Sequence, residues 1–231
     1  MKLFIGIPSY SGITMQFASS MLTLARHEDL ELSLHIGVCY VGKGRNELAM
    51  DFLAGDCDKI LQIDNDILFT RADVRRISAH DLDIVGGCYY KKEANRVVVA
   101  EALDMGKRTA GEDGLLEVKY MGTGFMCVKR EVFEKMIRAW EGEDWFWYID
   151  ELSRELRYDF FPHGVHPKLH RWLGEDWFFC QRAGELGYKV YADTKCSLRH
   201  IGTAIYPIEQ PPIPPKREIK LPKSELVSNK T

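Results

Sequence analysis

The sequence predicts an α/β protein, a three-layer α/β/α sandwich built around a mostly parallel central sheet. The first observation is that apolar runs typical of strands alternate with segments of helical periodicity through the first 90 residues. Strands that alternate with helices of this size form parallel sheets covered on both faces. The second is that 231 residues, 45% of them hydrophobic and 28% charged, can bury the core of one substantial domain or two small ones.

Each element of the first half has its own pattern. Strands are expected where short apolar runs occur, at residues 2–8, 31–41, 59–64 and 81–90. Helices are expected where apolar residues recur every three or four positions, at residues 13–28, 45–55 and 70–80. Thr70 is the expected N-cap of the last helix, because a threonine hydroxyl can accept a hydrogen bond from the first helical turn.

The second half differs in character. Residues 97–103 and 115–122 are expected to be antiparallel strands on either side of a turn-rich stretch. A glycine turn at 122–124 leads into a further strand, and 130–140 has the pattern of an amphipathic helix. All five tryptophans lie between residues 140 and 180, so aromatic side chains are concentrated in this half.

The C-terminal segment stands apart by composition. Residues 207–231 hold six of the nine prolines, with five basic and three acidic groups. The segment therefore carries a formal charge of +2. Since the whole chain carries −3, the remaining residues carry −5. Because proline interrupts regular helices, we expect a basic tail that wraps the body or stays mobile.

Composition excludes several classes of protein. No run approaches the 18 apolar residues of a transmembrane helix, and the apolar run at the N-terminus is too short for a signal peptide. The formal charge of −3 argues against a general nucleic-acid coat, although it leaves room for a local basic patch. The six cysteines form no CxxC pair and several lie in apolar runs, so we expect free thiols in a reducing cytoplasm.

The most informative segment is the apolar strand that ends in Asp64-Asn65-Asp66. In open α/β sheets, ligands bind beyond the carboxyl ends of the strands. Residues two apart in extended chain project to the same side, so Asp64 and Asp66 can converge. Two adjacent carboxylates repel each other unless a cation neutralises them, and Mg²⁺ or Mn²⁺ would suit oxygen ligands. The alternative to a metal site is an acidic turn that ends the strand and has no function in binding.

A second acidic pair, Glu175-Asp176, opens a predicted helix that is followed by a strand at 188–193 and then His200. Carboxylates at a helix start are favoured by the helix dipole, which is the structural explanation for the pair. A neutral imidazole is a suitable third metal ligand, so His200 is a candidate. A lone histidine is otherwise a surface or structural residue.

The order of these motifs resembles the GT-A glycosyltransferases: a strand with DxD, then GTGF, then the Glu-Asp helix, then a late histidine. The chain looks most like small family-2-type enzymes of bacteria and phages, with some likeness to Anp1-type mannosyltransferases. The resemblance covers about residues 1–206, with 1–90 as the nucleotide-binding half and 91–206 as the acceptor half. It implies a UDP- or GDP-linked sugar donor, Mn²⁺ or Mg²⁺, and an acceptor hydroxyl on a glycan, lipid-linked sugar, protein or modified nucleic acid.

The resemblance also implies roles for individual residues. Asp66 would bind the metal, Asp64 would contact the metal or the donor ribose, and His200 would complete the metal site. Tyr10 would stack on the base. The residues expected to bind the nucleotide sugar are Pro8, Ser9, Tyr10, Arg45, Asn46, Asp64, Asn65, Gly122, Thr123 and Gly124. Solvation of a helix start explains Arg45 and Asn46 equally well, and an ordinary turn explains the two glycines.

The chemistry of an inverting transfer requires a base. An acceptor hydroxyl is a poor nucleophile at neutral pH, so a carboxylate within hydrogen-bond reach must take its proton. Asp176 is our candidate for this base, with Glu175 orienting donor or acceptor. A retaining enzyme would not require this base.

The aromatic segment at 143–172 predicts either an acceptor platform or a buried hydrophobic lid. His163, His166 and His170 have zinc-like spacing, but no cysteine nearby in sequence completes a tetrahedral set.

Two alternative functions remain at this stage. A sugar nucleotidyltransferase has a similar sheet, but it usually has a basic, glycine-rich loop after the first strand. The corresponding residues of this chain, 8–16, contain no lysine or arginine. A non-catalytic sugar- or nucleic-acid-binding module would need no base, and the combination of DxD, Glu-Asp and histidine argues against it.

Overall fold

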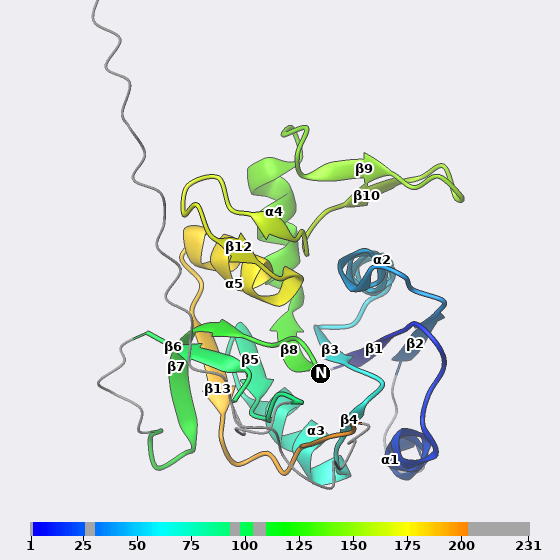
Figure 1. Cartoon of the computed structure of the whole chain (residues 1–231), viewed down its shortest axis with the longest axis vertical. Helices are drawn as coiled ribbons and strands as arrows, with labels where there is room; N and C mark the ends of the chain where they lie inside the picture. The colour runs from blue at the N-terminus through cyan, green and yellow to red at the C-terminus, as the bar shows by residue number, and fades with distance from the viewer. Residues whose placement is uncertain (1, 26–30, 93–97, 104–109, 203–231) are drawn as a thin grey trace, which may run out of the picture.

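The structure is a computed structural model, and it describes residues 2–25, 31–92, 98–103 and 110–202. The predicted tail at 207–231 lies outside the described residues. The described helices are α1 (Met15–Ala25), α2 (Val41–Ala54), α3 (Arg71–Ala79), α4 (Arg130–Trp140) and α5 (Glu175–Glu185). The large sheet contains, in spatial order, β2 (Glu31–Ile36), β1 (Leu3–Ser9), β3 (Lys59–Ile63), β8 (Phe125–Lys129), β5 (Ile84–Gly87), β13 (Val190–Asp193), β7 (Leu115–Met121) and β6 (Ala100–Ala102) (Figure 1).

Most strands of this sheet run in one direction. β1 pairs in parallel with β2 and β3, and β13 pairs in parallel with β5. β8 lies antiparallel between β3 and β5, and β7 lies antiparallel between β13 and β6. Six of the eight strands therefore share a direction, and the predicted mostly parallel sheet is confirmed. The predicted antiparallel pairing of the segments around 106–114 is confirmed by β6 and β7.

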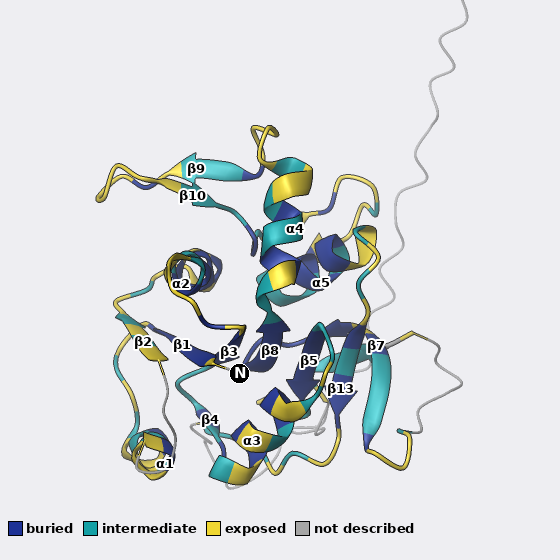
Figure 2. Ribbon diagram, turned by 180° about the vertical axis from the view of Figure 1, so that it is seen from behind, coloured by how far each residue is buried: buried dark blue, intermediate teal, exposed yellow. Residues whose placement is uncertain are grey.

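Alternate residues of the central strands face different layers of helices. Phe4 of β1 and Ile60 of β3 belong to the same buried cluster as Phe52 of α2. Their neighbours Ile5 and Leu61 belong to the cluster that contains Phe17 and Leu24 of α1. Figure 1 shows α2, α4 and α5 on one side of the sheet and α1 and α3 on the other. This is the predicted three-layer sandwich, and β1 is buried along its whole length because both of its faces are covered (Figure 2).

The local signals of the first half gave the right type for each element, but several boundaries differ. α2 begins at Val41 and not at 45, and β5 covers Ile84–Gly87 of the predicted 81–90. Thr70 accepts a hydrogen bond from the Asp73 N–H, and the Asp73 carboxylate accepts one from the Thr70 N–H, so the predicted cap of α3 is confirmed. The strand predicted through residue 41 is wrong at its end, because β2 stops at Ile36. Gly37 takes a φ of 82°, which an L-residue rarely adopts, and the turn that follows leads directly into α2.

Three small sheets were not predicted from the sequence. They pair β9 (Trp147–Ile149) with β10 (Leu156–Tyr158), β11 (Gly164–Val165) with β12 (Trp172–Leu173), and β4 (Ile67–Leu68) with β14 (Arg199–His200). Strands of two or three residues are too short to show a periodic pattern. The first two pairs are hairpins within the aromatic segment, and the third brings His200 beside the loop that follows β3.

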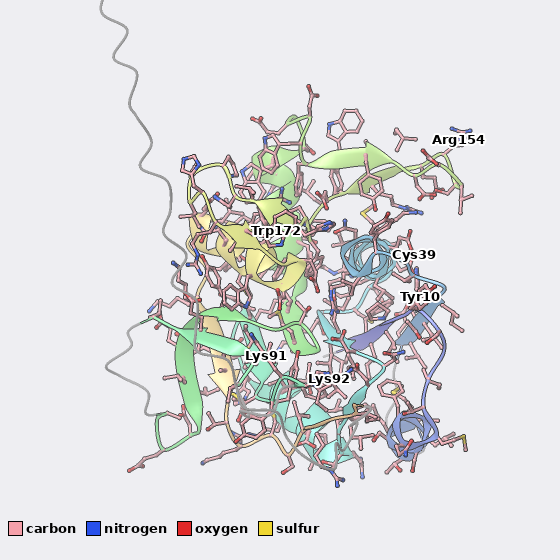
Figure 3. All side chains as sticks on the ribbon, in the orientation of Figure 1. Tyr10, Cys39, Lys91, Lys92, Arg154 and Trp172 are labelled. Atoms are coloured by element: carbon pink, nitrogen blue, oxygen red, sulfur yellow. The ribbon has the colours of Figure 1, made fainter. Side chains whose placement is uncertain are left out.

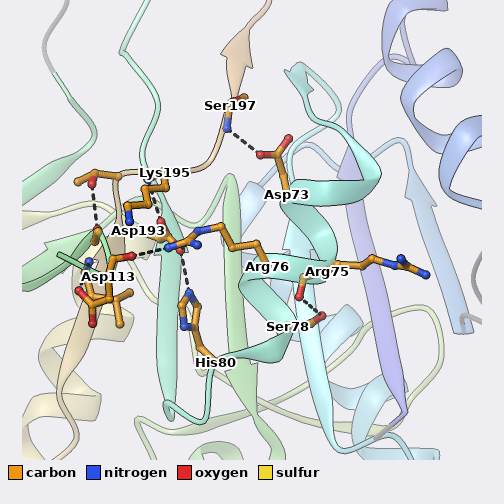
Figure 4. A network of polar contacts seen from close by, with 12 residues as sticks. Asp73, Arg75, Arg76, Ser78, His80, Asp113, Asp193, Lys195 and Ser197 are labelled. Carbon is orange, nitrogen blue, oxygen red and sulfur yellow. Dashed lines mark hydrogen bonds and ion pairs between the residues drawn. The ribbon is translucent and has the colours of Figure 1, made fainter. Parts of the chain in front are cut away.

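A polar network fastens the chain that leads to β14 (Figure 4). The fully buried Asp193 carboxylate lies 2.7 Å from Nε of Arg76 and 2.8 Å from Nε2 of His80, both from the α3 region. Four residues further on, the Ser197 N–H donates to the Asp73 carboxylate at 2.7 Å. α3 therefore anchors the segment between β13 and β14, and with it the position of His200.

The compositional expectations can be compared with the described residues. No helix among them combines the length and the apolar character needed to cross a membrane. All six cysteines are free thiols, and Cys57, Cys127 and Cys180 are buried as small apolar residues, as expected.

Candidate active site

A pocket of about 310 Å³ lies at the carboxyl ends of β1 and β3. These strands are parallel neighbours, so the residues that follow each of them meet at one edge of the sheet. The pocket is lined by Pro8, Ser9, Tyr10, Val38, Cys39, Val41, Asp64, Asn65 and Asp66. The structure thus brings together the candidate residues from the first strand and those from the DxD segment. Tyr10 and Cys39 are labelled on this side of the molecule in Figure 3.

Part of the pocket wall is held by internal hydrogen bonds. Asn65 Nδ2 donates to Ser9 Oγ at 2.8 Å and to the Gly12 carbonyl at 2.6 Å. Ser9 is buried, whereas the Tyr10 side chain is 70% exposed. Ser9 and Asn65 therefore shape the pocket, and Tyr10 has a free ring face on which a flat ligand can stack.

Arg45 of α2 joins the two acidic motifs. Its guanidinium is 2% exposed and donates to Asp64 Oδ1 at 2.6 Å and to Gln62 Oε1 at 3.1 Å. Its Nε lies 3.4 Å from Glu175 Oε1, the first residue of α5. Burial acts to lower the Arg45 pKa, but the charges of Asp64 and Glu175 outweigh it and raise the pKa above its ordinary value. A permanently charged arginine therefore links the end of β3 to the start of α5.

Asp176 follows directly and has an unusual carboxyl group. One oxygen accepts a hydrogen bond from the Trp177 N–H at 2.7 Å. Burial, and next to it the negative charge of Glu175, raise the pKa of Asp176 to about 6. The favourable helix N-terminus does not overcome these effects. A carboxylate with a pKa near 6 is ionised at neutral pH and basic enough to accept a proton from a hydroxyl group.

Asp66 lies on the open side of the site, between two nitrogen-bearing side chains. Lys92 Nζ is 2.5 Å from Asp66 Oδ2, and His200 Nε2 is 3.4 Å from Asp66 Oδ1. His200 Nδ1 faces the Tyr90 carbonyl at 2.8 Å, so this nitrogen must carry the proton. The Ile201 N–H donates to the Asp66 carbonyl at 2.7 Å and holds β14 in place.

This arrangement fits a divalent cation. An unprotonated Nε2 of His200 and the Asp66 carboxylate would both be ligands for a cation placed between them. Histidine ligands of metals typically donate their other N–H to a carbonyl or carboxylate, as Nδ1 of His200 does here. Asp64, by contrast, already gives one oxygen to Arg45.

The glycines at 122–124 are required by close packing. A Cβ at Gly124 would collide with Tyr89 Oη and would lie 2.8 Å from Asp64 Oδ2. The Gly124 N–H donates to Tyr89 Oη at 3.0 Å, and the Gly124 carbonyl accepts from the Asp64 N–H at 3.0 Å. A Cβ at Gly122 would likewise collide with Val99. The turn therefore supports Asp64. The buried Thr123 hydroxyl lies within the turn and has no hydrogen-bond partner among the residues that the structure describes.

Both polar atoms of the Asn46 side chain have hydrogen-bond partners inside the protein. Its Oδ1 accepts from the Phe161 N–H at 2.9 Å, and its Nδ2 donates to Asp159 Oδ1 at 2.9 Å. Asn46 therefore ties α2 to the 159–161 segment, and its contact with a nucleotide stays a prediction.

The aromatic segment divides into a buried and an exposed part. Phe146, Phe160 and Phe161 are buried in the cluster under α4 and α5, as predicted for a hydrophobic lid. Trp145 and Trp172 are 49% and 69% exposed, as an acceptor platform would require. Trp172 is labelled beside α5 in Figure 3.

Zinc is not supported at the histidines of this segment. His166 Nδ1 accepts hydrogen bonds from the Lys168 and Leu169 N–H groups, which makes it part of a turn. Among the described residues, the group of ligand-type side chains close enough to share a metal is Glu31, Asp56 and Cys57, at the amino ends of β2 and β3. Burial, followed by Glu31, raises the pKa of the Cys57 thiol to about 11, so it is a poor metal ligand there.

Three residues of the site were missed by sequence reasoning: Gln62, Tyr89 and Lys92. Gln62 carries a usable signal, because it is a buried polar residue within an apolar strand. Lys92 follows a predicted strand at the same edge of the sheet as Asp66, which is a weaker signal. Tyr89 carries none, since its hydroxyl contact with Gly124 depends on tertiary packing.

Comparison with known proteins places the fold. No protein-family model matches the chain, and no curated protein matches it by sequence. The chain is similar to the crystal structure of A197 from STIV, with a TM-score of 0.58, 21% identity, and 88% of this chain and 87% of that chain covered.

Two glycosyltransferase structures share the same fold. One is GalNAc-T7 with UDP, GalNAc and Mn²⁺, with a TM-score of 0.54, 8% identity, and 87% of this chain covered. The other is S. aureus TarS 1–349 in complex with UDP-GlcNAc, with a TM-score of 0.50, 13% identity, and 89% of this chain covered. The chain spans 44% and 60% of these two proteins. The GT-A-type fold expected from the sequence is confirmed.

Proposed function

We propose that this protein is a metal-dependent glycosyltransferase that moves a sugar from a nucleoside-diphosphate sugar to an acceptor hydroxyl. The observation that carries the proposal is the buried Arg45, which joins Asp64 at the end of β3 to Glu175 at the start of α5. This link supports the assignment of the DxD segment and the candidate base Asp176, which follows Glu175, to one site. The likeness of the fold to proteins that hold UDP, UDP-GlcNAc and Mn²⁺ supports the same function.

The donor would bind in the pocket at the ends of β1 and β3. Tyr10 would stack on the base, and Pro8 and Ser9 would lie against the nucleoside. UDP- and GDP-linked sugars are both candidates. The turn at 122–124 would lie below the sugar.

Asp66 and His200 would hold Mn²⁺ or Mg²⁺, with Asp64 contacting the metal or the ribose. When bound, the cation would act as a Lewis acid for the negative charge that grows on the diphosphate. The ion pair with Arg45 holds Asp64 in place, so the orientation of Asp64 does not depend on the metal.

Asp176 would accept the proton of the acceptor hydroxyl. As the acceptor oxygen bonds to the anomeric carbon, the bond from that carbon to the diphosphate breaks, and its electron pair leaves with the diphosphate. Glu175, held by Arg45, would orient the reacting groups. This role for Asp176 belongs to an inverting reaction, and a retaining reaction would proceed without it.

The acceptor half would be formed by residues 91–206, with Trp145 and Trp172 as exposed aromatic surfaces. Aromatic faces dock sugar rings and bases alike, so acceptors from both groups belong in a screen.

A thermal-shift screen of UDP- and GDP-sugars, each with and without Mn²⁺, tests the proposal. We expect one donor to raise the Tm of the full chain, and to do so only with the metal present. Absence of a metal-dependent shift for every donor would contradict the proposed function.

A further inference from the structure

The Asp66 carboxylate has a protein cation as its closest polar partner. Lys92 Nζ lies 2.5 Å from Asp66 Oδ2, on the oxygen that does not face His200. The side chains of Lys92 and Asp66 are 45% and 29% exposed. Lys92 is two residues beyond Tyr90, whose carbonyl holds His200, so one short segment positions both partners of Asp66.

We propose that Lys92 is an exchangeable cation of the active site. It neutralises Asp66 while no metal is bound, and a divalent cation displaces it from Asp66. The released ammonium group then contacts the diphosphate of the donor. This inference rests on the proposed function, and it adds a residue that positions the donor and controls metal affinity.

The contrast with Arg45 shows why Lys92 can exchange. Arg45 is 2% exposed and has three partners, so its separation from Asp64 would leave a buried guanidinium and a partly buried carboxylate without each other. Lys92 is half exposed and has one carboxylate partner among the described contacts. A lysine is a compact charge on a flexible stem, and partly exposed ion pairs of this kind are weak.

The displacement follows from charge. A divalent cation bound to Asp66 and His200 would repel an ammonium group that is within hydrogen-bond distance of the same carboxylate. The donor diphosphate brings new negative charge to this place, and Lys92 can reach it by rotating its side chain. Metal and diphosphate should therefore bind cooperatively, because each improves the site for the other.

Mn²⁺ titrations of the full chain test the exchange. We expect Lys92→Met to bind Mn²⁺ about three- to fivefold more tightly than the wild type in the absence of nucleotide, by calorimetry or electron paramagnetic resonance. Lys91→Met removes the same charge from the neighbouring exposed residue and should leave the Kd within about twofold. Lys92→Arg keeps the cation and should stay close to the wild type.

A second titration tests the transfer of Lys92 to the donor. At saturating Mn²⁺, Lys92→Met should bind UDP more weakly than the wild type by about three- to fivefold. The two changes have opposite signs, which a purely structural role of Lys92 would not produce. Both variants must show wild-type circular dichroism, which we expect because both lysines are exposed.

Three results would overturn the inference. They are an unchanged Mn²⁺ Kd in Lys92→Met, an equal gain in Lys91→Met, and unchanged UDP binding in Lys92→Met. These failures differ from failure of the proposed function, in which Mn²⁺ binds but no nucleotide sugar does. If neither the wild type nor Lys92→Met binds Mn²⁺, the metal-dependent function and the exchange are both wrong.

Discussion

Asp64 and Asp66 are separated by one residue, yet they lie in two different kinds of environment. Asp64 faces α2 and α5, where the buried Arg45 holds it together with Glu175. Asp66 faces the open side, where the half-exposed Lys92 and His200 approach it. The buried side is a fixed framework, and the open side consists of groups that a ligand can rearrange. The same residue type is therefore paired with a buried cation at one position and with a half-exposed cation at the other.

The largest effect is expected on the buried side, at the candidate base. Asp176→Asn should lower turnover about 100- to 10,000-fold, because an amide cannot accept the proton of the acceptor. Donor binding should change by less than about twofold, since Asp176 is not assigned to the donor. Steady-state kinetics and calorimetry on the same preparation separate the two. Normal turnover in this variant would remove Asp176 from the role of base.

The next effect concerns the framework itself. Arg45→Met should lower the free energy of unfolding by about 3 kcal/mol, because Asp64 and Glu175 lose the buried charge that neutralises them. Urea unfolding measures the change. Arg138→Met serves as the matched control, because Arg138 is 62% exposed and makes only a 3.8 Å contact with Glu134. A similar loss in both variants would show that Arg45 is not the buried link described here.

On the open side we expect the opposite pattern. Asp66→Ala should weaken Mn²⁺-dependent donor binding roughly 10- to 100-fold, the scale seen when metal sites lose supporting groups. The free energy of unfolding should change by less than about 1 kcal/mol, because the partner Lys92 is half exposed. Calorimetry with and without a chelator, together with urea unfolding, measures both. If donor affinity is unchanged, the assignment of the metal to Asp66 is wrong.

The smallest effect is a dependence on pH. The pKa of Asp176 is raised to about 6, so its carboxylate should become protonated as the pH falls through 6. Below that value kcat/KM should drop about tenfold per pH unit. Donor binding measured over the same range separates a loss of donor affinity from a loss of the base. A flat profile between pH 5 and 7 would contradict a base with this pKa.

The same shift has a defined sign for stability. The folded protein holds the Asp176 proton more tightly than the unfolded chain does, because the pKa is higher in the folded state. The contribution of this group to the free energy of unfolding is therefore largest at low pH and falls as the pH rises toward about 6. The proposed base therefore lowers the free energy of unfolding near neutral pH relative to low pH.

Several features of the fold could be predicted because they depend on neighbours in sequence. The cap at Thr70 needs only Asp73, three residues away, and the strand at 59–64 is evident from consecutive apolar residues. The two hairpins of the aromatic segment were missed because their strands have only two or three residues. The end of β2 was misplaced because the turn depends on a single glycine with a positive φ.

By itself, the sequence determined the alternation of strands and helices and the chemical identity of the acidic groups at Asp64, Asp66, Glu175 and Asp176. This was possible because apolar periodicity and residue type are local properties of the chain. Only the tertiary structure decided which acid meets which cation. Arg45 is 19 residues from Asp64 and 130 from Glu175, and Lys92 is 26 from Asp66. Such distant contacts follow from the order of strands in the sheet. This order places Asp64 beside the buried Arg45 and Asp66 beside the half-exposed Lys92.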